Sequence, residues 1–364
     1  MSREILQDII GGFSPDKFTR FFREKNRSFA PRQESFTHYN DEYFSDGIKL
    51  GEIKFSESEK VVVCAFKANQ PLSERSGKKA QYEKGKKILK DTHSDAGIVI
   101  FYDCHGNFRF SLIYPEAIGN RRQWSNFRRF TYFVSPDPEF TNKTFLQRIG
   151  GKDNDGGFSS LDKIKEAFSL SAVTDIFYKD FFVEYNKLVE AVKKRNKILD
   201  QEKARDFVLL FAVRTIFLGF IQKKGWIGND EKFIQNLLKE YQKKCVNKDL
   251  FYEKWLTPLF FQALNSPPGR KVSYGDNDFS EETEKNMQMA PYLNGGLFKE
   301  KLDYDDQDYF LPDKEIKDFF DFLFSHNFTI EENSYEDEDL QLNPEFLGII
   351  FERLVNKANG AIYT

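Results

Sequence analysis

The stretch VVVCAFKANQ, residues 61–70, decides how the first part of the chain is organised. Its β-branched and apolar residues, its short length and the Pro71 that follows predict a buried strand. One cation, Lys67, stands just before the end of this run. Lysines at strand ends commonly extend into water, so Lys67 is either a surface residue of that kind or part of a site.

Helix and strand patterns surround this stretch in a regular order. The predicted elements are a helical region over 1–30, strands over 44–55 and 60–68, a helix over 73–90, and strands over 96–103, 108–114 and 127–135. Ser14 and Pro15 are typical of a helix start, as N-cap and first helical residue. The order predicts a small α/β domain over residues 1–150.

A change of composition follows this domain. The segment GGKDNDGGFSS, which ends at residue 160, is rich in Gly and Asp and predicts a linker over 151–160. Beyond it the strand signal nearly vanishes and helical spacing dominates as far as residue 364. An apolar stripe that includes Phe207, Phe211 and Leu218 predicts the central helix of a bundle.

Length and composition exclude several classes of protein. With 364 residues, 40% of them hydrophobic and 30% charged, the chain is long enough for two or three globular domains. No run of eighteen apolar residues predicts a membrane span, and the N-terminus has no signal-peptide pattern. The three cysteines, Cys64, Cys104 and Cys245, are scattered and odd in number. They favour a reducing cytoplasm over a disulfide framework or a metal site.

Charge is unevenly placed along a chain whose net charge is only −3. Basic residues concentrate between 75 and 90 and again between 121 and 129, whereas EENSYEDEDL, 331–340, is acidic. A local basic region on a nearly neutral chain favours an anionic partner, with nucleic acid first. The alternative is that the lysines form an ordinary solvated helix face.

The order of elements around Lys67 resembles the PD-(D/E)XK nuclease superfamily. In that family one strand carries an acid, the next carries an acid two residues before a lysine, and a basic helix follows. Asp46 and Glu52 lie on or before the first such strand here, and Lys67 lies on the second. The resemblance implies Mg²⁺-dependent cleavage of DNA, with Asp46 and Glu52 holding the metal and Lys67 positioning the attacking water.

One position departs from that pattern. Two residues before Lys67 the family has an acidic residue, or sometimes glutamine, and this chain has Ala65. Three explanations remain open. The acid stands on another element, with Glu52, Glu74 and Glu83 as candidates; or the domain is a degenerate nuclease that only binds DNA or partners; or position 65 has been substituted.

The helical part resembles a second, more specific family. The segments RTIFLGFIQKKGWIG (214–228), APYLNGGLF (290–298) and LNPEFLGIIFERLVNKANGAIYT (342–364) resemble the connector of single-chain type IIG restriction-modification enzymes and of related phage-defence methyltransferases. In that family the connector leads into an N6-adenine DNA methyltransferase domain. The resemblance implies a chain truncated at the start of that domain, so that S-adenosylmethionine binds only in the full-length enzyme.

These patterns together give the prediction of an α/β nuclease-type domain with a helical connector. The predicted partners are double-stranded DNA and the chain's own C-terminal methyltransferase and target-recognition domains, with no membrane. The residues expected to contact nucleic acid are Arg75, Lys78, Lys79, Gln81, Arg121 and Arg122. The rival hypotheses are a degenerate domain that binds DNA without cutting it and a scaffold that binds proteins of a defence complex.

Overall fold

The computed structural model describes residues 3–57, 59–74, 76–118, 121–150, 158–195, 201–245, 249–267, 274, 278–293, 295–300, 310–329, 334–342, 348–350 and 352–353, without the side chains of 3, 117–118 and 121–125. The chain forms two compact units. Unit 1 comprises Met1–Ile176 and Glu331–Gln341, and unit 2 comprises Phe177–Ile330 and Leu342–Thr364.

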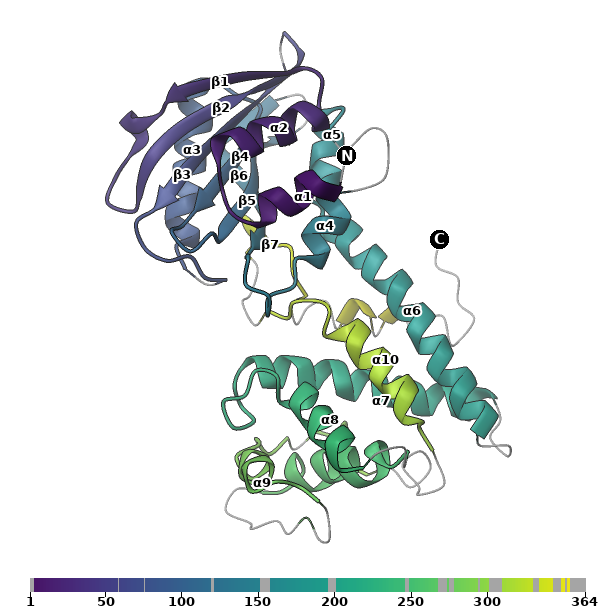
Figure 1. The fold of residues 1–364 in the computed structure, drawn as a ribbon. Helices are drawn as coiled ribbons and strands as arrows, with labels where there is room; N and C mark the ends of the chain where they lie inside the picture. The colour runs from purple at the N-terminus through teal and green to yellow at the C-terminus, as the bar shows by residue number, and fades with distance from the viewer. Residues whose placement is uncertain are drawn as a thin grey trace. The chain divides into compact units, whose positions relative to one another are not determined.

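Unit 1 is built on one mixed sheet of seven strands (Figure 1). The strands are β1 (Phe29–Ser35), β2 (Phe44–Ser56), β3 (Glu59–Ala68), β4 (Ala96–Tyr102), β5 (Phe108–Ile118), β6 (Arg121–Val134) and β7 (Asp337–Asp339). They lie in sequence order across the sheet. All neighbours are antiparallel except β3 with β4 and β6 with β7. The unit is therefore an α/β fold.

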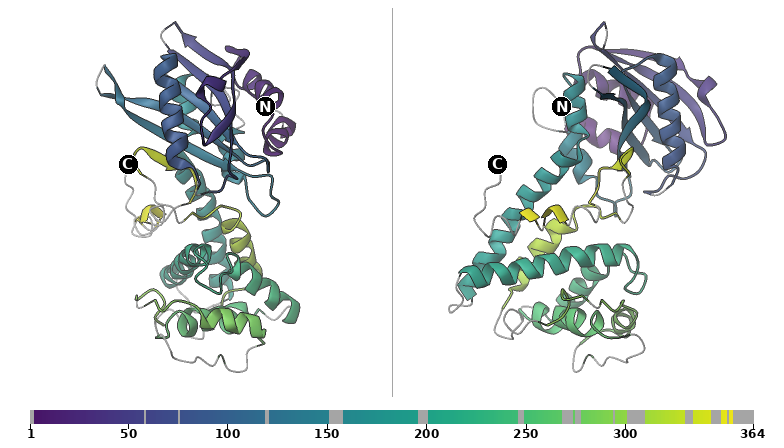
Figure 2. Two further views of the ribbon diagram at one scale, coloured as in Figure 1. Left: turned by 90° about the vertical axis from the view of Figure 1, so that its left-hand side faces the viewer. Right: turned by 180° about the vertical axis from the view of Figure 1, so that it is seen from behind.

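Helices cover both faces of this sheet, as Figures 1 and 2 show. Helices α1 (Arg3–Ile10) and α2 (Pro15–Lys25) pack on one face, and α3 (Lys78–Thr92) packs on the other. Because β3 and β4 are parallel, the chain must cross over between them, and α3 is that crossover. Two short helices, α4 (Lys143–Ile149) and α5 (Leu161–Ala167), contribute to the same core as α1 and α2.

The position of β3 in the sheet explains why residues 61–66 are all apolar. Val61, Val63 and Ala65 belong to the core beneath α1 and α2. Val62, Cys64 and Phe66 alternate with them and belong to the core beneath α3. A strand buried on both faces loses the usual polar alternation and reads as one continuous apolar run.

Several predicted elements are confirmed, and residues next to their ends determine where the helices begin. Helix α2 begins with Pro15 after an extended Ser14, as predicted. Helix α3 begins at Lys78 instead of residue 73, because Gly77 before it takes a left-handed conformation with φ 71°. Strand β1 is not among the predicted elements: it contains Pro31 and is exposed along most of its length, as suits an edge strand.

The predicted division of the chain differs from the compact units. Most of the predicted linker, 151–160, lies outside the described residues. Phe158 at its end is fully buried in the core of unit 1, as is Ile164 of α5. Unit 1 extends to Ile176 and also includes residues 331–341, which come after most of unit 2 in the chain. Apolar residues beyond the glycine-rich segment complete the first core, so the composition change does not mark its end.

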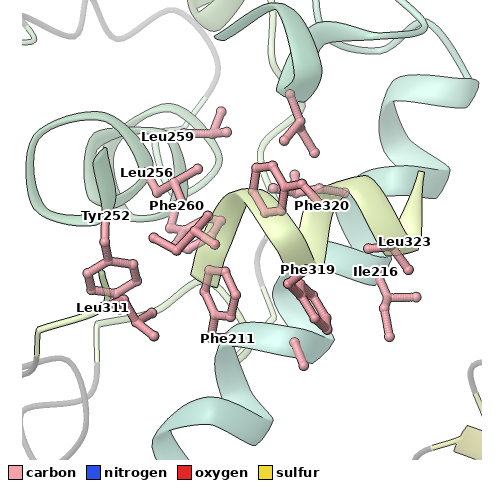
Figure 3. Packing of buried hydrophobic residues seen from close by; sticks show 14 of the residues in the cluster. Phe211, Ile216, Tyr252, Leu256, Leu259, Phe260, Leu311, Phe319, Phe320 and Leu323 are labelled. Atoms are coloured by element: carbon pink, nitrogen blue, oxygen red, sulfur yellow. The ribbon is translucent and has the colours of Figure 1, made fainter. Parts of the chain in front are cut away.

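Unit 2 is helical and is held by aromatic packing. Its helices are the later part of α6 (Leu170–Arg195), then α7 (Gln201–Lys223), α8 (Phe233–Lys244), the π-helical segments η2 (Phe251–Leu256) and η3 (Pro258–Ala263), α9 (Glu281–Gln288) and α10 (Asp313–Leu323). Figure 3 shows Phe211 of α7 near Phe319 and Phe320 of α10. The prediction of α7 as the central helix agrees with its burial on all sides. Within the described part of the chain, no helix is long and apolar enough to cross a membrane.

Candidate nucleic-acid interface

Lys67 lies beside Asp46 at the end of β3. The Lys67 Nζ and an Asp46 carboxylate oxygen are 3.7 Å apart, and the two side chains are 42% and 63% exposed. Lys67 pairs with Ser45 in the sheet, and the register of β2 shifts just after that residue. Asp46 lies in this irregularity with φ 50°, a conformation that aspartate tolerates. The bulge thus allows a residue of β2 to reach the end of β3.

Aromatic groups border this ion pair. Tyr102, the residue of β4 that pairs with Lys67, stacks on Phe13 with ring centres 4.1 Å apart. Burial, and then the negative charge of Asp46, raise the pKa of Tyr102. The described surroundings of Lys67 therefore offer one carboxylate, one phenol and an apolar ring.

Glu52, the second predicted metal ligand, lies elsewhere. It pairs with Val62, seven residues along β2 from the position opposite Lys67, which is roughly 20 Å at the rise of a strand. Its carboxylate is 3.3 Å from Lys49 and 3.1 Å from Lys54. Burial opposes ionisation of Glu52, but these two ammonium groups hold its pKa below the usual range. The structure brings Asp46 and Lys67 together and leaves Glu52 apart.

The residues at this end of β3 do not fit a Mg²⁺ site. Ala65 supplies no ligand atom and is fully buried. Asp46 is one carboxylate, already paired with a cation. Magnesium takes six oxygen ligands, usually including one or two carboxylates in a site shared with phosphate and water. Among the described residues, no cluster of three or more His, Cys, Asp or Glu could hold a metal.

A groove opens at the same end of the sheet, on the side of α3. It has a volume of about 740 Å³. One wall is the segment before β2 and the other is the start of α3. The lining residues are Tyr39, Asn40, Asp41, Tyr43, Gly77, Lys78, Lys79, Ala80, Glu83, Lys84 and Lys87. Lysine is thus the commonest residue of the lining, so the groove is an electropositive cavity with two tyrosines.

Lys84 fixes the two walls of the groove to each other. Its Nζ donates to the backbone carbonyl of Tyr39 and to a carboxylate oxygen of Asp41. The other Asp41 oxygen accepts from the backbone N–H groups of Tyr43 and Phe44, at 2.9 and 3.0 Å. Burial opposes ionisation of Asp41, but the bond from Lys84 holds its pKa below the usual value. Lys84 is buried and satisfied, so its role is structural.

Two other lysines of the groove remain available to a ligand. Lys79 and Lys87 are exposed, and neither has a carboxylate partner among the residues that the structure describes. Lys87 lies 5.9 Å from the ring centre of Tyr39. Tyr43, on the opposite wall, is 55% exposed. The first turn of α3 adds the positive end of a helix, which favours bound anions.

The other predicted nucleic-acid contacts fall into three groups. Lys79 lies at the groove, as does Lys78, whose Nζ is 2.6 Å from Asp339. Gln81 is fully buried and accepts a hydrogen bond from Arg129, so it faces the protein interior. Arg75 and the side chains of Arg121 and Arg122 lie outside the described residues.

The arginines at the end of the second basic stretch meet an acidic partner within the chain. Arg129 forms a two-point ion pair with Asp337, at 2.7 and 2.9 Å, and Arg128 pairs with Glu338. Both acids belong to β7, from the segment EENSYEDEDL. The basic stretch makes these arginines candidates for nucleic-acid contacts, and Arg129 is instead only 1% exposed. The sequence shows both charge clusters but carries no signal that they meet.

Comparison with known proteins points to restriction-modification. No family model matches the chain, and no solved structure matches it. The chain is 30% identical over 217 residues to a protein of Methanocaldococcus jannaschii named "Putative type II restriction enzyme and methyltransferase". The match covers 57% of this chain and 17% of that protein. The chain is therefore similar to a restriction-modification protein and spans less than a fifth of that relative's length.

Proposed function

We propose that this chain is the DNA-engaging front part of a restriction-modification enzyme. The name of the relative supports the general role. The order of helices and strands in unit 1, with β3 and β4 parallel and joined by α3, supports a PD-(D/E)XK-type fold for that unit. In this proposal unit 1 contacts duplex DNA and unit 2 is the connector.

The groove between α3 and the segment before β2 is the observation that carries the DNA contact. Its exposed lysines, Lys79 and Lys87, suit two phosphates, because ammonium groups without carboxylate partners release counterions from DNA when they bind. The hydroxyl of Tyr43 is hydrogen-bonded to Glu42, so what Tyr43 offers is its exposed ring, which suits a contact with a sugar of the backbone. Contacts of this type set affinity and leave sequence recognition to other parts of an enzyme.

A binding titration tests this proposal. The full chain is titrated into a fluorescent duplex of about two helical turns at several salt concentrations, beside a Lys79→Ala/Lys87→Ala variant. We expect the variant to bind roughly tenfold more weakly and its salt dependence to lose about one phosphate contact per lysine. A Lys86→Ala/Lys90→Ala variant of the same helix, outside the groove, is the matched control. Equal affinities for all three proteins would contradict the proposal.

A second candidate function is Mg²⁺-dependent cleavage of DNA at Lys67. The exposed Lys67–Asp46 pair at the end of β3 favours it, because an acid and a lysine stand where that fold has its reactive groups. The donor set weighs against it: Ala65 is buried and Glu52 is far from Lys67. For this reason we assign DNA binding to unit 1 and no hydrolytic step to these residues.

Plasmid cleavage separates the two candidates. Unmethylated plasmid is incubated with the protein and Mg²⁺, beside an EDTA control and a Lys67→Ala variant. DNA binding without cutting supports the first proposal. Cutting that needs both the metal and Lys67 would establish the second and would require an additional metal ligand from residues outside those described.

Methylation belongs to the proposal only for the full-length enzyme. The relative's name includes a methyltransferase, and the matched part is a small share of its length. We expect S-adenosylmethionine, the methyl donor, to bind a methyltransferase domain of the full-length enzyme and not residues 1–364. Isothermal titration of the 364-residue chain with S-adenosylmethionine checks this, and saturable binding would contradict it.

A further inference from the structure

Asp339 of strand β7 is a buried junction between three parts of unit 1. One of its carboxylate oxygens accepts a hydrogen bond from Arg109 Nη1 at 3.1 Å, and the other lies 2.6 Å from Lys78 Nζ. Asp339 is 4% exposed and Arg109 is fully buried. Charges so deeply buried are stable only when they are paired and hydrogen-bonded. Separating Asp339 from Arg109 would therefore cost a large free energy.

Arg109 extends the junction to the segment between β3 and α3. Its Nη2 donates to the backbone carbonyls of Ser73 and Glu74, at 2.9 and 2.6 Å. Lys78, the first residue of α3, is held by Asp339 directly. Asp339 is therefore linked through Arg109 to Ser73 and Glu74, and directly to Lys78 at the start of α3. Gly77 and Lys78 line the groove.

We infer that Asp339 is a positioning residue for DNA binding: by holding Ser73, Glu74 and Lys78, it fixes the α3 wall of the groove. The inference rests on the proposed function of the groove. It has a consequence for assembly, because Asp339 belongs to 331–341, which follow most of unit 2 in the chain. The groove is complete only when this late segment has paired with β6.

Asp339 has two opposite effects on DNA binding, and we expect its ordering of the α3 wall to outweigh its neutralisation of Lys78. Asp339 also neutralises Lys78, and this removes at most one phosphate contact from the groove. Loss of Asp339 would remove a carboxylate from beside Lys78, but it would also loosen the part of the wall that contains Gly77 and Lys79. DNA would then bear the cost of ordering that segment, which a preformed site avoids. We therefore expect binding to weaken when Asp339 is changed.

Asp339→Asn and Asp337→Asn form a matched pair for the test. Both acids lie on β7, and each change leaves a buried arginine without its carboxylate. Asp339 contacts Lys78 and the arginine that holds Ser73 and Glu74, whereas the ion pair of Asp337 is with Arg129. In Asp339→Asn we expect the amides of residues 72–79 to exchange with deuterium at least tenfold faster and duplex affinity to fall about tenfold. In Asp337→Asn we expect both to stay near wild type under conditions where the protein is folded.

Three results would overturn the inference. Equal effects of the two changes would reduce Asp339 to a general structural role. Tighter binding by Asp339→Asn, with steeper salt dependence, would mean that Asp339 chiefly withholds Lys78 from DNA. Unchanged exchange at residues 72–79 would mean that Asp339 does not hold the wall.

Two further measurements distinguish a failure of this inference from misfolding of the variant and from a failure of the proposed function. If Asp339→Asn does not fold, Asp339→Glu keeps the charge and changes only the geometry, and the same faster exchange is expected. If the wild-type protein does not bind the duplex, the proposed function fails, and the exchange comparison alone still decides whether Asp339 holds the segment.

Discussion

Two groups of cationic side chains in unit 1 differ in their exposure and in their partners. Lys79 and Lys87 at the groove are exposed and have no carboxylate partner among the described residues, so they are free to meet an external anion. Arg109 and Arg129 are 0% and 1% exposed, and each is paired with an acid of β7. The first group suits ligand binding and the second holds the sheet together.

The difference shows that clustered positive charge does not by itself identify a binding surface. Lys79, Lys87 and Arg129 all occur in basic stretches of the sequence, and all are candidates for nucleic acid on composition. What separates them is the segment that contains Asp337, Glu338 and Asp339, which is more than two hundred residues away from Arg129 in the chain. The partner of a buried charge is a property of the fold.

The largest expected effect is from removing one buried arginine. Arg129→Met should lower the free energy of unfolding by about 3 kcal/mol, because it removes a buried cation and leaves the partly buried carboxylate of Asp337 without its partner. Urea denaturation measures this. Lys79→Met at the groove, as the exposed counterpart, should change stability by less than about 0.5 kcal/mol. A similar small change at Arg129 would remove the distinction between the two groups.

A second substitution tests whether an acidic residue at position 65 could bind a metal ion. Ala65→Glu should destabilise unit 1 by more than about 2 kcal/mol, because it forces a larger, ionisable side chain into a closed core. Thermal unfolding with and without Mg²⁺ measures it. Stabilisation by Mg²⁺, or new plasmid cleavage, would show instead that the position opens onto a latent metal site near Lys67.

A buried ammonium provides a contrast with the buried arginines. Burial lowers the pKa of Lys25 to about 8. The unfolded chain keeps this proton up to about pH 10.5, so between these values folding releases a proton, and stability should rise with pH. The gain should be about 2 kcal/mol from about pH 8 to about pH 10. Urea denaturation of wild type and Lys25→Met across this range isolates it, and identical pH profiles would contradict it.

The exposed Lys67–Asp46 pair should contribute least to stability. Lys67→Ala or Asp46→Asn should change the free energy of unfolding by less than about 1 kcal/mol, because water screens both groups. Urea denaturation of the two single variants and the double variant measures the coupling between them. A coupling above about 2 kcal/mol would mean that the pair is a structural element like those of β7.

The sequence is sufficient where hydrophobic signals are local. The apolar run around Val63 predicts β3, and Ser14 with Pro15 predicts the start of α2. The order of elements predicts an α/β unit, which the sheet confirms. Each of these elements depends on a pattern within a few residues, and their order follows from the chain itself.

Features that depend on distant partners could not be predicted. Strand β7 consists of three acidic residues, which favour a solvated segment until Arg109 and Arg129 are brought beside them. Gln81 belongs to a basic helix, yet it is buried and accepts a hydrogen bond from Arg129. The groove depends on Lys84 binding Tyr39 and Asp41 across more than forty residues, a contact that no spacing announces.

Lysine footprinting with and without duplex DNA is the decisive test of DNA binding at the groove. The protein is labelled with an amine-reactive reagent, alone and with saturating duplex, and modified lysines are quantified by mass spectrometry. We predict that DNA protects Lys79 and Lys87 several-fold and leaves Lys86 and Lys90 unchanged, while buried Lys84 reacts in neither state. If DNA binds and Lys79 and Lys87 keep their full reactivity while other lysines are protected, the groove is not the interface and DNA meets another surface of the chain.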